Sequence, residues 1–329
     1  MTVPYVSVVV PGYNHGRYLA RRLQSILNQT FTDFEVLLLD DASTDDSREV
    51  ARPFLADDRV RPLYNEVNSG SGYRQWDKGV REARGSLVWI AESDDWAEPQ
   101  LLEQLVMRVQ GQVGVAYCQS WRAWGDGSAD ERVHNAEWTD DLDTGRWRQN
   151  FTANGAQECA HYLCLKNTIP NASAVCFRRD LYLHVGGVEA NWRLVADWHL
   201  WMRMLLNADV AFVADPLNYF RMEPASVTHQ AKRDGTNALE SYRLALWSAA
   251  HLSLTSQTRE VLCDKMFYVW THPQLEGGEW YGWKRNARIY ALARALDPRL
   301  SKHLARRLLG RTAHRVPGLQ RIRRVWRAR

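Results

Sequence analysis

Short apolar runs alternate with amphipathic stretches along the first 120 residues of the chain. The runs are rich in β-branched and aliphatic side chains, which predicts buried strands at 6–10, 34–39, 60–64, 87–91 and 113–117. Between them, apolar residues recur at spacings of three and four, which predicts helices near 19–27, 45–55, 73–83 and 99–109. This alternation favours an α/β fold with a mostly parallel sheet and helices on both faces.

The pattern changes after residue 118. Residues 119–171 are rich in Trp, Gly and Asp, and we expect loops with short elements there. The regular pattern returns with strands predicted at 172–177, 210–213 and 217–220 and a helix at 195–206. From residue 236 onward it is helical, with candidates at 238–252, 259–271, 283–295 and 301–309. We therefore expect an α/β domain over 1–230 and a helical C-terminal extension over 231–329.

Three polar clusters directly follow predicted strands. They read Pro-Gly-Tyr-Asn at 11–14, Asp-Asp-Ala-Ser-Thr at 40–44 and Glu-Ser-Asp-Asp-Trp at 92–96. In open parallel sheets, ligands bind outside the carboxyl ends of the strands. We expect the three clusters to converge on that edge and to form the functional site.

The cluster at 92–95 places three carboxylates within four residues. Such a group is electrostatically costly unless a cation neutralises it, and hard divalent ions such as Mg²⁺ or Mn²⁺ prefer these oxygen ligands. A cation there would also neutralise a diphosphate and make it a better leaving group. The alternative for an acidic cluster is a solvated turn with a helix cap. That alternative fits Asp45 and Asp46, and it stays open for Asp40 and Asp41.

Composition narrows the class of protein. With 45% hydrophobic and 24% charged residues, the chain has an ordinary globular composition. The five cysteines form an odd set without a C-x-x-C pair, so we expect neither a zinc site nor a disulfide framework, and a reducing compartment. No segment approaches the roughly 18–20 apolar residues that span a bilayer. These features predict a cytoplasmic protein that is soluble or peripheral to a membrane.

The net charge of +4 is unevenly distributed. Residues 301–329 contain ten Lys or Arg and no acid, which leaves about −6 on the first 300 residues. Leucines, valines and Trp326 interleave with these cations, a pattern typical of segments that bind anionic membrane surfaces. A solvated helix face is the alternative. No nucleic-acid-binding module accompanies the tail, so we expect no nucleic acid partner.

Three blocks of the sequence resemble family 2 glycosyltransferases, which are inverting enzymes with the GT-A fold. They read VSVVVPGYNHGRYLARRLQSILNQTFTDFEVLLLDDASTDDS, NSGSGYRQWDKGVREARGSLVWIAESDDW and VADWHLWMRMLLNADVAFVADPLNYFR. Together they cover most of 6–221, whereas the last 100 or so residues match no motif of the family. The resemblance implies a GT-A domain that transfers a sugar from a nucleotide-sugar donor to a glycan or lipid-linked acceptor, assisted by Mg²⁺ or Mn²⁺.

The resemblance also assigns donor-binding roles. It implies that Pro11 and Tyr13 line the nucleotide pocket, with the Tyr13 ring stacked on the base. Asn14 either supports the same loop or forms its turn. Asp41 would accept the N3–H of uracil or thymine, which favours UDP- or dTDP-sugars. Arg74 either contacts phosphate or is an exposed arginine at a helix start.

For the chemistry itself, the resemblance points to the acids. It implies that Asp95 binds the metal and that Asp94 holds ribose or metal-bound water. Glu92 stands where the family often has Asp, which leaves its part in the metal shell open. Asp197 is the candidate general base that takes the proton of the acceptor hydroxyl. The alternative for Asp197 is a first-turn acid that offsets the helix dipole.

Some positions depart from the family pattern. Many relatives have His soon after the Tyr-Arg pair that follows the base helix, but here the sequence reads Phe-Arg-Met-Glu at 220–223. His229 is a candidate substitute as a metal or phosphate contact, and Glu223 is a second candidate for the metal site. The Q-x-x-R-W signature of processive synthases is absent, which favours addition of a single sugar. Asp77 stands where relatives frequently have Asn, with no clear consequence.

Fifteen tryptophans are many for this length. Trp121, Trp124, Trp138 and Trp147 lie in the insert at 119–171, where they either stack on sugar rings or anchor loops. Two other functions compete with sugar transfer. A nucleotidyltransferase of similar fold would carry a glycine-rich basic loop after the first strand, and a non-catalytic carbohydrate-binding relative would keep the fold without turnover.

Overall fold

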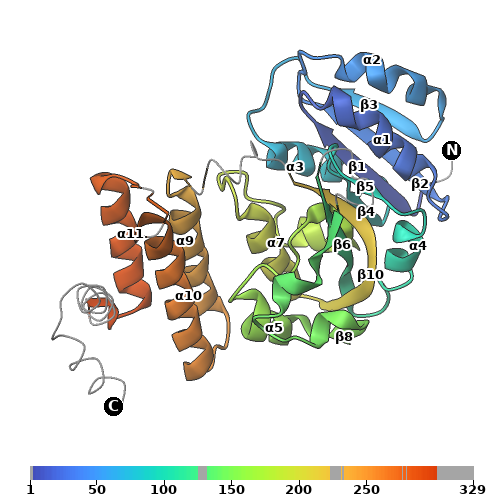
Figure 1. Cartoon of the computed structure of the whole chain (residues 1–329). Helices are drawn as coiled ribbons and strands as arrows, with labels where there is room; N and C mark the ends of the chain where they lie inside the picture. The colour runs from blue at the N-terminus through green and yellow to red at the C-terminus, as the bar shows by residue number, and fades with distance from the viewer. Residues whose placement is uncertain are drawn as a thin grey trace. The chain divides into compact units, whose positions relative to one another are not determined.

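The computed structural model describes residues 3–124, 132–222, 231, 233–275, 277–278 and 280–301, with the backbone alone for 132–136. These residues form two compact units that divide near Ala231, with Leu252–Leu254 counted in the first. The first unit is an α/β structure and the second is helical (Figure 1). No described helix is long and apolar enough to cross a membrane.

The first unit is built on one mixed sheet. Its path runs β3-β2-β1-β4-β9-β6-β10-β5, with β7 beside β6 and β8 beside β10. The strands are β1 (Val6–Gly12), β2 (Phe34–Asp40), β3 (Val60–Tyr64), β4 (Leu87–Ile90), β5 (Trp96–Ala97), β6 (Val113–Ala123), β7 (Arg132–His134), β8 (Phe151–Ala153), β9 (Val175–Arg178) and β10 (Asp209–Arg221).

The core strands β1–β4 are parallel, as is the pair β6 and β10. Strand β9 runs antiparallel between β4 and β6, and β5, β7 and β8 also pair antiparallel. The predicted α/β fold with a mostly parallel sheet is therefore confirmed.

Helices cover both faces of the sheet (Figure 1). They are α1 (Gly16–Leu27), α2 (Ser47–Ala51), α3 (Gly72–Glu82), α4 (Leu101–Val106), α5 (Gly155–Glu158), α6 (Arg179–His184) and α7 (Ala196–Leu205). Short 3-10 turns span η1 (Arg52–Ala56), η3 (Asn135–Thr139), η4 (Arg146–Arg148) and η6 (Ala172–Ala174), and η5 (Cys159–Leu163) is a π-helical turn.

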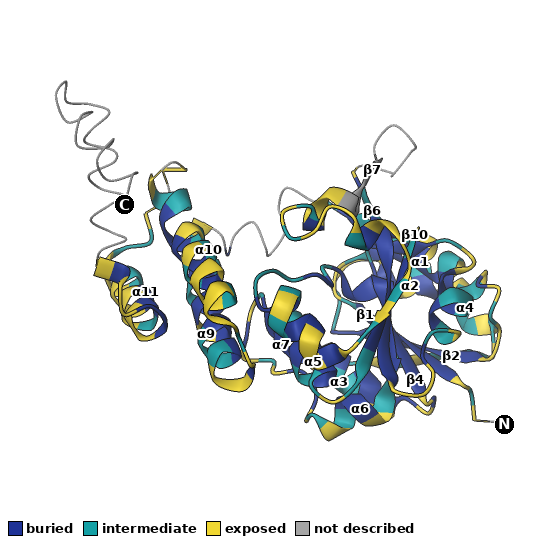
Figure 2. Cartoon of the chain, turned by 90° about the horizontal axis from the view of Figure 1, so that it is seen from below, coloured by how far each residue is buried: buried dark blue, intermediate teal, exposed yellow. Residues whose placement is uncertain are grey.

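Strand alternation assigns the two faces. Side chains at 6, 8 and 10 of β1 share a core cluster with Leu19, Leu23 and Leu101, so α1, α2 and α4 cover that face. The other face carries Val9 of β1 and receives α3, α6 and α7. There the strand residue Phe177 lies 5.6 Å from the ring of Tyr182 and 5.8 Å from that of Trp201. Figure 2 shows the strands buried and the helices exposed on their outer sides.

Several predicted boundaries are wrong. The helix predicted at 45–55 begins only at Ser47, and its α-helical part ends at Ala51. The chain continues as the 3-10 turn η1, which contains Pro53, a residue with no backbone N–H to donate. The strands predicted at 210–213 and 217–220 form one strand, β10, whose register shifts around Pro216. Strand β6 continues to Ala123, six residues past the predicted end of that strand. Residues 172–174 are a 3-10 turn ahead of β9.

The second unit contains α9 (Thr236–His251), α10 (Ser256–Leu275) and α11 (Trp283–Leu296). Its core includes Tyr242, Leu262 and Ile289, one buried residue from each helix. The indole of Trp270 donates a 2.8 Å hydrogen bond to Asn286 and so fastens α10 to α11. The basic tail at 302–329 lies outside the described residues.

Candidate functional site

The three predicted polar clusters meet at one edge of the sheet. Strands β1, β2 and β4 are parallel, so their carboxyl ends lie side by side. The backbone N–H of Asp41 donates to the carbonyl of Gly12 at 2.9 Å, and His15 Nδ1 lies 2.7 Å from Ser93 Oγ. The loops after β1, β2 and β4 are thus joined by direct hydrogen bonds.

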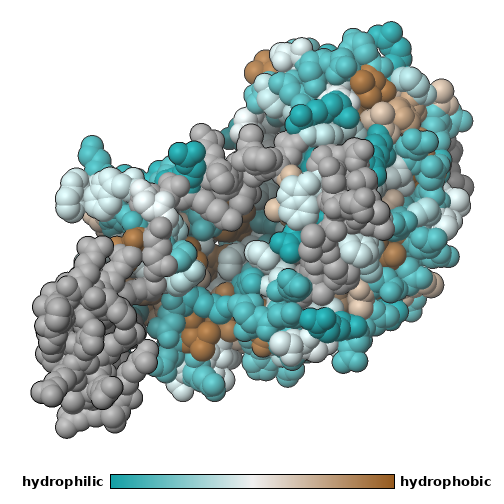
Figure 3. Space-filling view, in the orientation of Figure 1, coloured by the Kyte–Doolittle hydropathy of each residue, from teal (hydrophilic) through white to brown (hydrophobic). Residues whose placement is uncertain are grey.

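A small hollow opens where the loops meet. It is lined by residues from all three clusters together with side chains of α2 and β3, among them Gly12, His15, Asp40, Arg48, Tyr64 and Ser93. The surface of this unit seen in Figure 3 is otherwise mostly hydrophilic, with scattered apolar residues, as is normal for the exterior of a folded domain.

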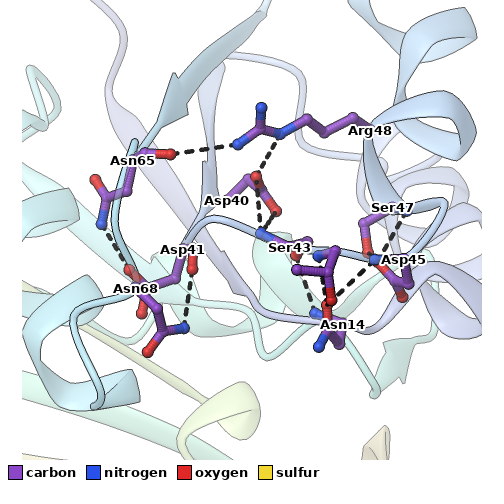
Figure 4. A network of polar contacts seen from close by, with 10 residues as sticks. Asn14, Asp40, Asp41, Ser43, Asp45, Ser47, Arg48, Asn65 and Asn68 are labelled. Atoms are coloured by element: carbon purple, nitrogen blue, oxygen red, sulfur yellow. Dashed lines mark hydrogen bonds and ion pairs between the residues drawn. The ribbon is translucent and has the colours of Figure 1, made fainter.

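Asn14 fastens the β1 loop to the β2 loop (Figure 4). Its backbone is left-handed, with φ 55°, and its Oδ1 accepts from the backbone N–H of Thr44 at 2.8 Å. Its own backbone N–H donates to Ser43 Oγ at 2.9 Å. These contacts correspond to the turn-forming alternative for Asn14. Ala42, on the facing loop, is also left-handed, with φ 61°.

Asp41 is buried and surrounded by neutral donors. Its Oδ1 accepts from Asn65 Nδ2 at 2.6 Å, from Ser69 N at 2.9 Å and from Gln75 Nε2 at 2.9 Å. Its Oδ2 accepts from Ser69 Oγ at 2.7 Å. This set of donors fixes the orientation of the carboxylate.

The neighbouring acids Asp40 and Asp45 form hydrogen bonds that stabilise the loop after β2. Asp40 accepts from Arg48 Nε at 2.6 Å, which joins the end of β2 to α2. Asp45 accepts from Gly16 N at 2.9 Å and from Ser47 N at 3.0 Å. Asp45 therefore satisfies backbone donors at the starts of α1 and α2. The cap alternative fits Asp45, whereas Asp46 makes no side-chain cap hydrogen bond at the start of α2 and Asp40 forms an ion pair with Arg48.

The acidic motif after β4 carries an excess of negative charge. Burial raises the pKa of Glu92 to about 8 and the pKa of Asp95 to about 7, and in both cases the charge of Asp94 raises it further. Burial also raises the pKa of Asp94. Each carboxylate thus resists ionisation in its buried surroundings.

Protein donors hold two of these acids in place. Asp95 Oδ1 accepts from the backbone N–H of Arg221 at 2.9 Å, and its Oδ2 accepts from Asn171 Nδ2 at 3.2 Å. Glu92 Oε1 accepts from Trp76 Nε1 at 2.6 Å. The guanidinium of Arg221 also donates to the backbone carbonyl of Asp94 at 2.8 Å.

A buried arginine lies behind the motif. Arg22, on the inner side of α1, is completely buried, and its guanidinium lies 5.0 Å from the centre of the Trp89 ring. None of its three guanidinium nitrogens has a hydrogen-bond partner within the described part of the chain. Burial lowers the pKa of Arg22 to about 10, while the charges of Asp95, Asp94 and Glu92 oppose this shift. Arg22 is therefore an internal counter-charge to the acidic motif.

Asp197 lies in the first turn of α7. Burial raises its pKa to about 6, against the opposing effect of hydrogen bonds from the backbone, from Asn167 and from Tyr73. The Asn167 amide reaches Asp197 Oδ2 at 3.4 Å. Asn167 and Asn171, which contacts Asp95, belong to one short segment. This segment therefore contacts both the candidate base and the acidic motif.

The insert is held by its tryptophans. Trp147 is buried, and its Nε1 donates to the Tyr117 hydroxyl at 2.8 Å, which matches the loop-anchoring alternative. Trp138 donates from Nε1 to the carbonyl of Asn167 at 2.8 Å but stays 39% exposed. Trp121 packs partly buried beside Trp96 and Tyr219. Trp124 is 38% exposed.

Comparison with known proteins decides the family. The profile of Glycosyl transferase family 2 matches residues 7–181, more than half of the chain and all three polar clusters. The chain belongs to this family.

Relatives of this glycosyltransferase include both uncharacterised and named proteins. This chain is 30% identical over 261 residues to the uncharacterized protein MT1568 of Mycobacterium tuberculosis. The aligned residues cover 74% of this chain and 75% of MT1568. The chain is 41% identical over 106 residues to the glycosyltransferase GlyG of Streptococcus pneumoniae, which covers 32% of this chain and 35% of GlyG.

Solved structures confirm the GT-A fold of the glycosyltransferase. S. aureus TarS 1-349 in complex with UDP-GlcNAc aligns with a TM-score of 0.65 at 16% identity, over 87% of this chain and 79% of that one. The mannosyltransferase PcManGT of Pyrobaculum calidifontis, in complex with GDP-Man and Mn²⁺, aligns with a TM-score of 0.55 at 16% identity, over 90% and 81% of the two chains.

The acidic motif of the glycosyltransferase fits a hard divalent cation by its chemistry. It supplies three carboxylates, the oxygen ligands that such ions prefer, and a bound cation would favour their ionised forms against the burial that raises their pKa values. No three His, Cys, Asp or Glu side chains of the described residues converge as a ready-made metal site. The Asp95 oxygens face Asn171 and Arg221 instead.

The remaining predicted residues are dispersed around the loops. Pro11 is buried at the end of β1, whereas Tyr13 is 45% exposed. Arg74 is exposed, and its guanidinium donates to the carbonyl of Ser69 at 3.1 Å. His229 and Glu223, the candidate substitutes in the metal site, lie outside the described residues.

Proposed function

We propose that this glycosyltransferase transfers a sugar, with inversion, from a UDP- or dTDP-sugar to a glycan or lipid-linked acceptor. One observation carries the proposal. Asn167 and Asn171, four residues apart, contact the Asp197 and Asp95 carboxylates respectively, which supports a single site for proton removal and diphosphate departure. We assign this catalysis to residues 1–230.

The proposed base has a suitable pKa. At about 6, Asp197 is ionised near neutral pH yet more basic than an ordinary carboxylate. It would take the proton of the acceptor hydroxyl as that oxygen attacks the anomeric carbon and the bond to the diphosphate breaks. A single carboxylate and an in-line displacement give inversion, and no nucleophilic carboxylate is needed.

Asp95 and Asp94 are the residues we assign to hold Mg²⁺ or Mn²⁺. A bound divalent cation would stabilise the negative charge on the departing diphosphate. PcManGT, of the same fold, has been solved with Mn²⁺. The carboxylates of this chain would lose their mutual repulsion on binding such an ion.

The donor base is assigned to Asp41. Its carboxylate, fixed by neutral donors, would accept the N3–H that uracil and thymine both present. We place Tyr13, Pro11 and Arg74 around the same nucleotide. TarS, which shares the fold, has been solved with UDP-GlcNAc.

A thermal-shift series with UDP, dTDP and GDP, each with and without Mn²⁺, tests the donor assignment. We expect UDP or dTDP with Mn²⁺ to raise the melting temperature most. Stabilisation by GDP alone would contradict the role of Asp41. Turnover of the preferred nucleotide-sugar then separates a transferase from a non-catalytic carbohydrate-binding relative.

We assign the basic segment at 302–329 to an anionic membrane surface, which would suit a lipid-linked acceptor. Ten cations interleaved with apolar residues in 301–329 support this assignment, at roughly 1 kcal/mol for each cation near anionic lipid. Truncation after Ser301 should abolish sedimentation with anionic liposomes and leave donor hydrolysis intact. Unchanged sedimentation would rule the assignment out.

A further inference from the structure

The first turns of α3 contact carboxylates from separate parts of the site. This helix begins at Gly72, and none of its side chains belongs to the acidic clusters. Two consecutive residues, Gln75 and Trp76, are 2% and 4% exposed. Each donates a hydrogen bond to a different carboxylate of the proposed donor site.

Gln75 supports the acid assigned to the donor base. Its Nε2 donates to Asp41 Oδ1 at 2.9 Å and lies 3.0 Å from Ser69 Oγ, which itself donates to Asp41 Oδ2 at 2.7 Å. The Gln75 amide and the Ser69 hydroxyl thus hold both oxygens of Asp41. An apolar side chain at 75 would remove one of these donors from a buried carboxylate.

Trp76 supports the acidic motif. Its indole Nε1 donates to Glu92 Oε1 at 2.6 Å. An indole N–H only donates, so the Glu92 oxygen that it contacts must act as an acceptor. The Trp76 ring is itself fixed, because Tyr73 packs edge-on against it at 5.1 Å and Trp201 lies at 6.5 Å.

Tyr73, also on α3, contacts the proposed base Asp197. It stands three residues before Trp76, on the same side of the helix. Its hydroxyl lies 3.2 Å from the carbonyl oxygen of Leu194, just ahead of α7, and a hydrogen bond from Tyr73 lowers the pKa of Asp197. Residues 73–76 therefore reach all three acidic elements of the site.

The helix is held against the sheet at a fixed distance. A Cβ added at Gly79 would lie 2.3 Å from Val9 Cγ1 in β1, closer than real Cβ atoms come. Only glycine allows α3 to approach β1 this closely. The close approach leaves the first turns of α3 little freedom to shift along the strand ends, so their side chains act from a rigid element.

We propose that Gln75 and Trp76 are paired positioning residues of the donor site: Gln75 orients Asp41 toward the nucleotide base, and Trp76 orients Glu92 toward the cation and diphosphate. This inference rests on the proposed function. It gives Glu92, whose role the family resemblance leaves open, a place in the acidic motif. On this proposal, one turn of α3 supports both the carboxylate that recognises the base and the carboxylate near the diphosphate.

The test uses the full chain and two shape-conserving variants. Gln75→Met keeps the length of the side chain and removes its donor, and Trp76→Phe keeps an aromatic ring and removes the N–H. Arg81→Ala is the control, because Arg81 is exposed on the same helix and its side chain forms an ion pair with Asp77 one turn earlier. Isothermal titration calorimetry with UDP alone and with Mn²⁺ in saturating UDP gives the two affinities.

Loss of one hydrogen bond to a charged group corresponds to about a tenfold change in affinity. We expect Gln75→Met to raise the Kd for UDP about tenfold and to change the Kd for Mn²⁺ little. We expect the reverse for Trp76→Phe. Gln75→Asn, which retains an amide on a shorter stem, should recover part of the UDP affinity, and Arg81→Ala should match the wild type.

Two outcomes would overturn the inference. One is unchanged affinity in both variants while the wild type binds UDP and Mn²⁺. The other is that each variant loses affinity for UDP and for Mn²⁺ equally and also melts at a lower temperature. That result would show that Gln75 and Trp76 serve only the stability of the fold. If the wild type binds neither UDP nor another nucleotide, the proposed function itself fails, which is a separate result.

Discussion

Asn171 donates a hydrogen bond from its side-chain amide to Oδ2 of Asp95 at 3.2 Å, and both residues are buried. Four residues earlier, Asn167 donates to Asp197. The short segment from Asn167 to Asn171 therefore contacts two carboxylates, one from the loop after β4 and one from α7. Its geometry links the proposed cation site to the proposed base.

Replacing Asn171 with alanine should destabilise the protein. The side chain also accepts from Ser173 N at 2.7 Å, so Asn171→Ala leaves a buried donor and a buried carboxylate with fewer partners. We expect a loss of about 1–3 kcal/mol in the free energy of unfolding, measured by urea denaturation. Asn154→Ala, which removes a similar but exposed amide cap, is the matched control and should cost about 1 kcal/mol. Equal stability of Asn171→Ala and the wild type would contradict this role.

The stability of the metal-free protein should depend on pH through the acidic motif. The pKa of Glu92 rises from 4.5 to about 8 and that of Asp95 from 3.8 to about 7 on folding. The folded state thus keeps protons that the unfolded state has already released. This contribution to stability is complete below about pH 4 and is lost as the pH rises through about 7–8.

Differential scanning fluorimetry in EDTA checks this dependence. We expect the melting temperature to fall between about pH 4 and pH 8, and to fall less in Glu92→Gln, which cannot ionise at that position. Mn²⁺ should reduce the fall by neutralising the carboxylates. The same slope in Glu92→Gln and the wild type would contradict the raised pKa of Glu92.

Asn14 should contribute to stability in two separable ways. Its left-handed backbone disfavours alanine by about 1–2 kcal/mol, and its side chain fastens the β2 loop through Thr44. Asn14→Gly loses only the side-chain hydrogen bonds, whereas Asn14→Ala loses these and adds backbone strain. Urea denaturation should therefore rank the wild type above Asn14→Gly and Asn14→Ala last. Equal stability of the two variants would contradict the strain at this position.

Much of the sheet could be predicted because its central strands are buried on both faces. Continuous apolar runs locate β1, β2 and β4 nearly to the residue, and the edge strand β3, which is half exposed, also matches its predicted range. Strand direction is not encoded in such runs, so the strand predicted at 172–177 gave no sign that β9 would lie antiparallel between β4 and β6. The Asp-Pro pair at 215–216 indicates a turn in sequence, but pairing with β6 carries β10 through it with a register shift.

The acids of the site could be predicted, whereas their supports could not. Asn65, Gln75 and Asn171 are ordinary polar residues in sequence, and only the folded chain brings them to Asp41 and Asp95.

Arg22 is different, since a signal was present. It follows Leu19 by three residues and precedes Ile26 by four, which places it on the buried stripe of α1. A cation on an apolar stripe indicates a buried counter-charge somewhere in the fold.

The measurement that tests the central claim most directly compares sugar transfer by the wild type and Asp197→Asn, which keeps the shape of the side chain but cannot accept a proton. The same preparations are titrated with UDP to show that the donor site is intact. We expect wild-type transfer to rise with pH up to about 6 and then to level off, because the base must be ionised. Asp197→Asn should lose about 10²–10⁴-fold in kcat with little change in UDP affinity. Transfer by Asp197→Asn at the wild-type rate would contradict the account.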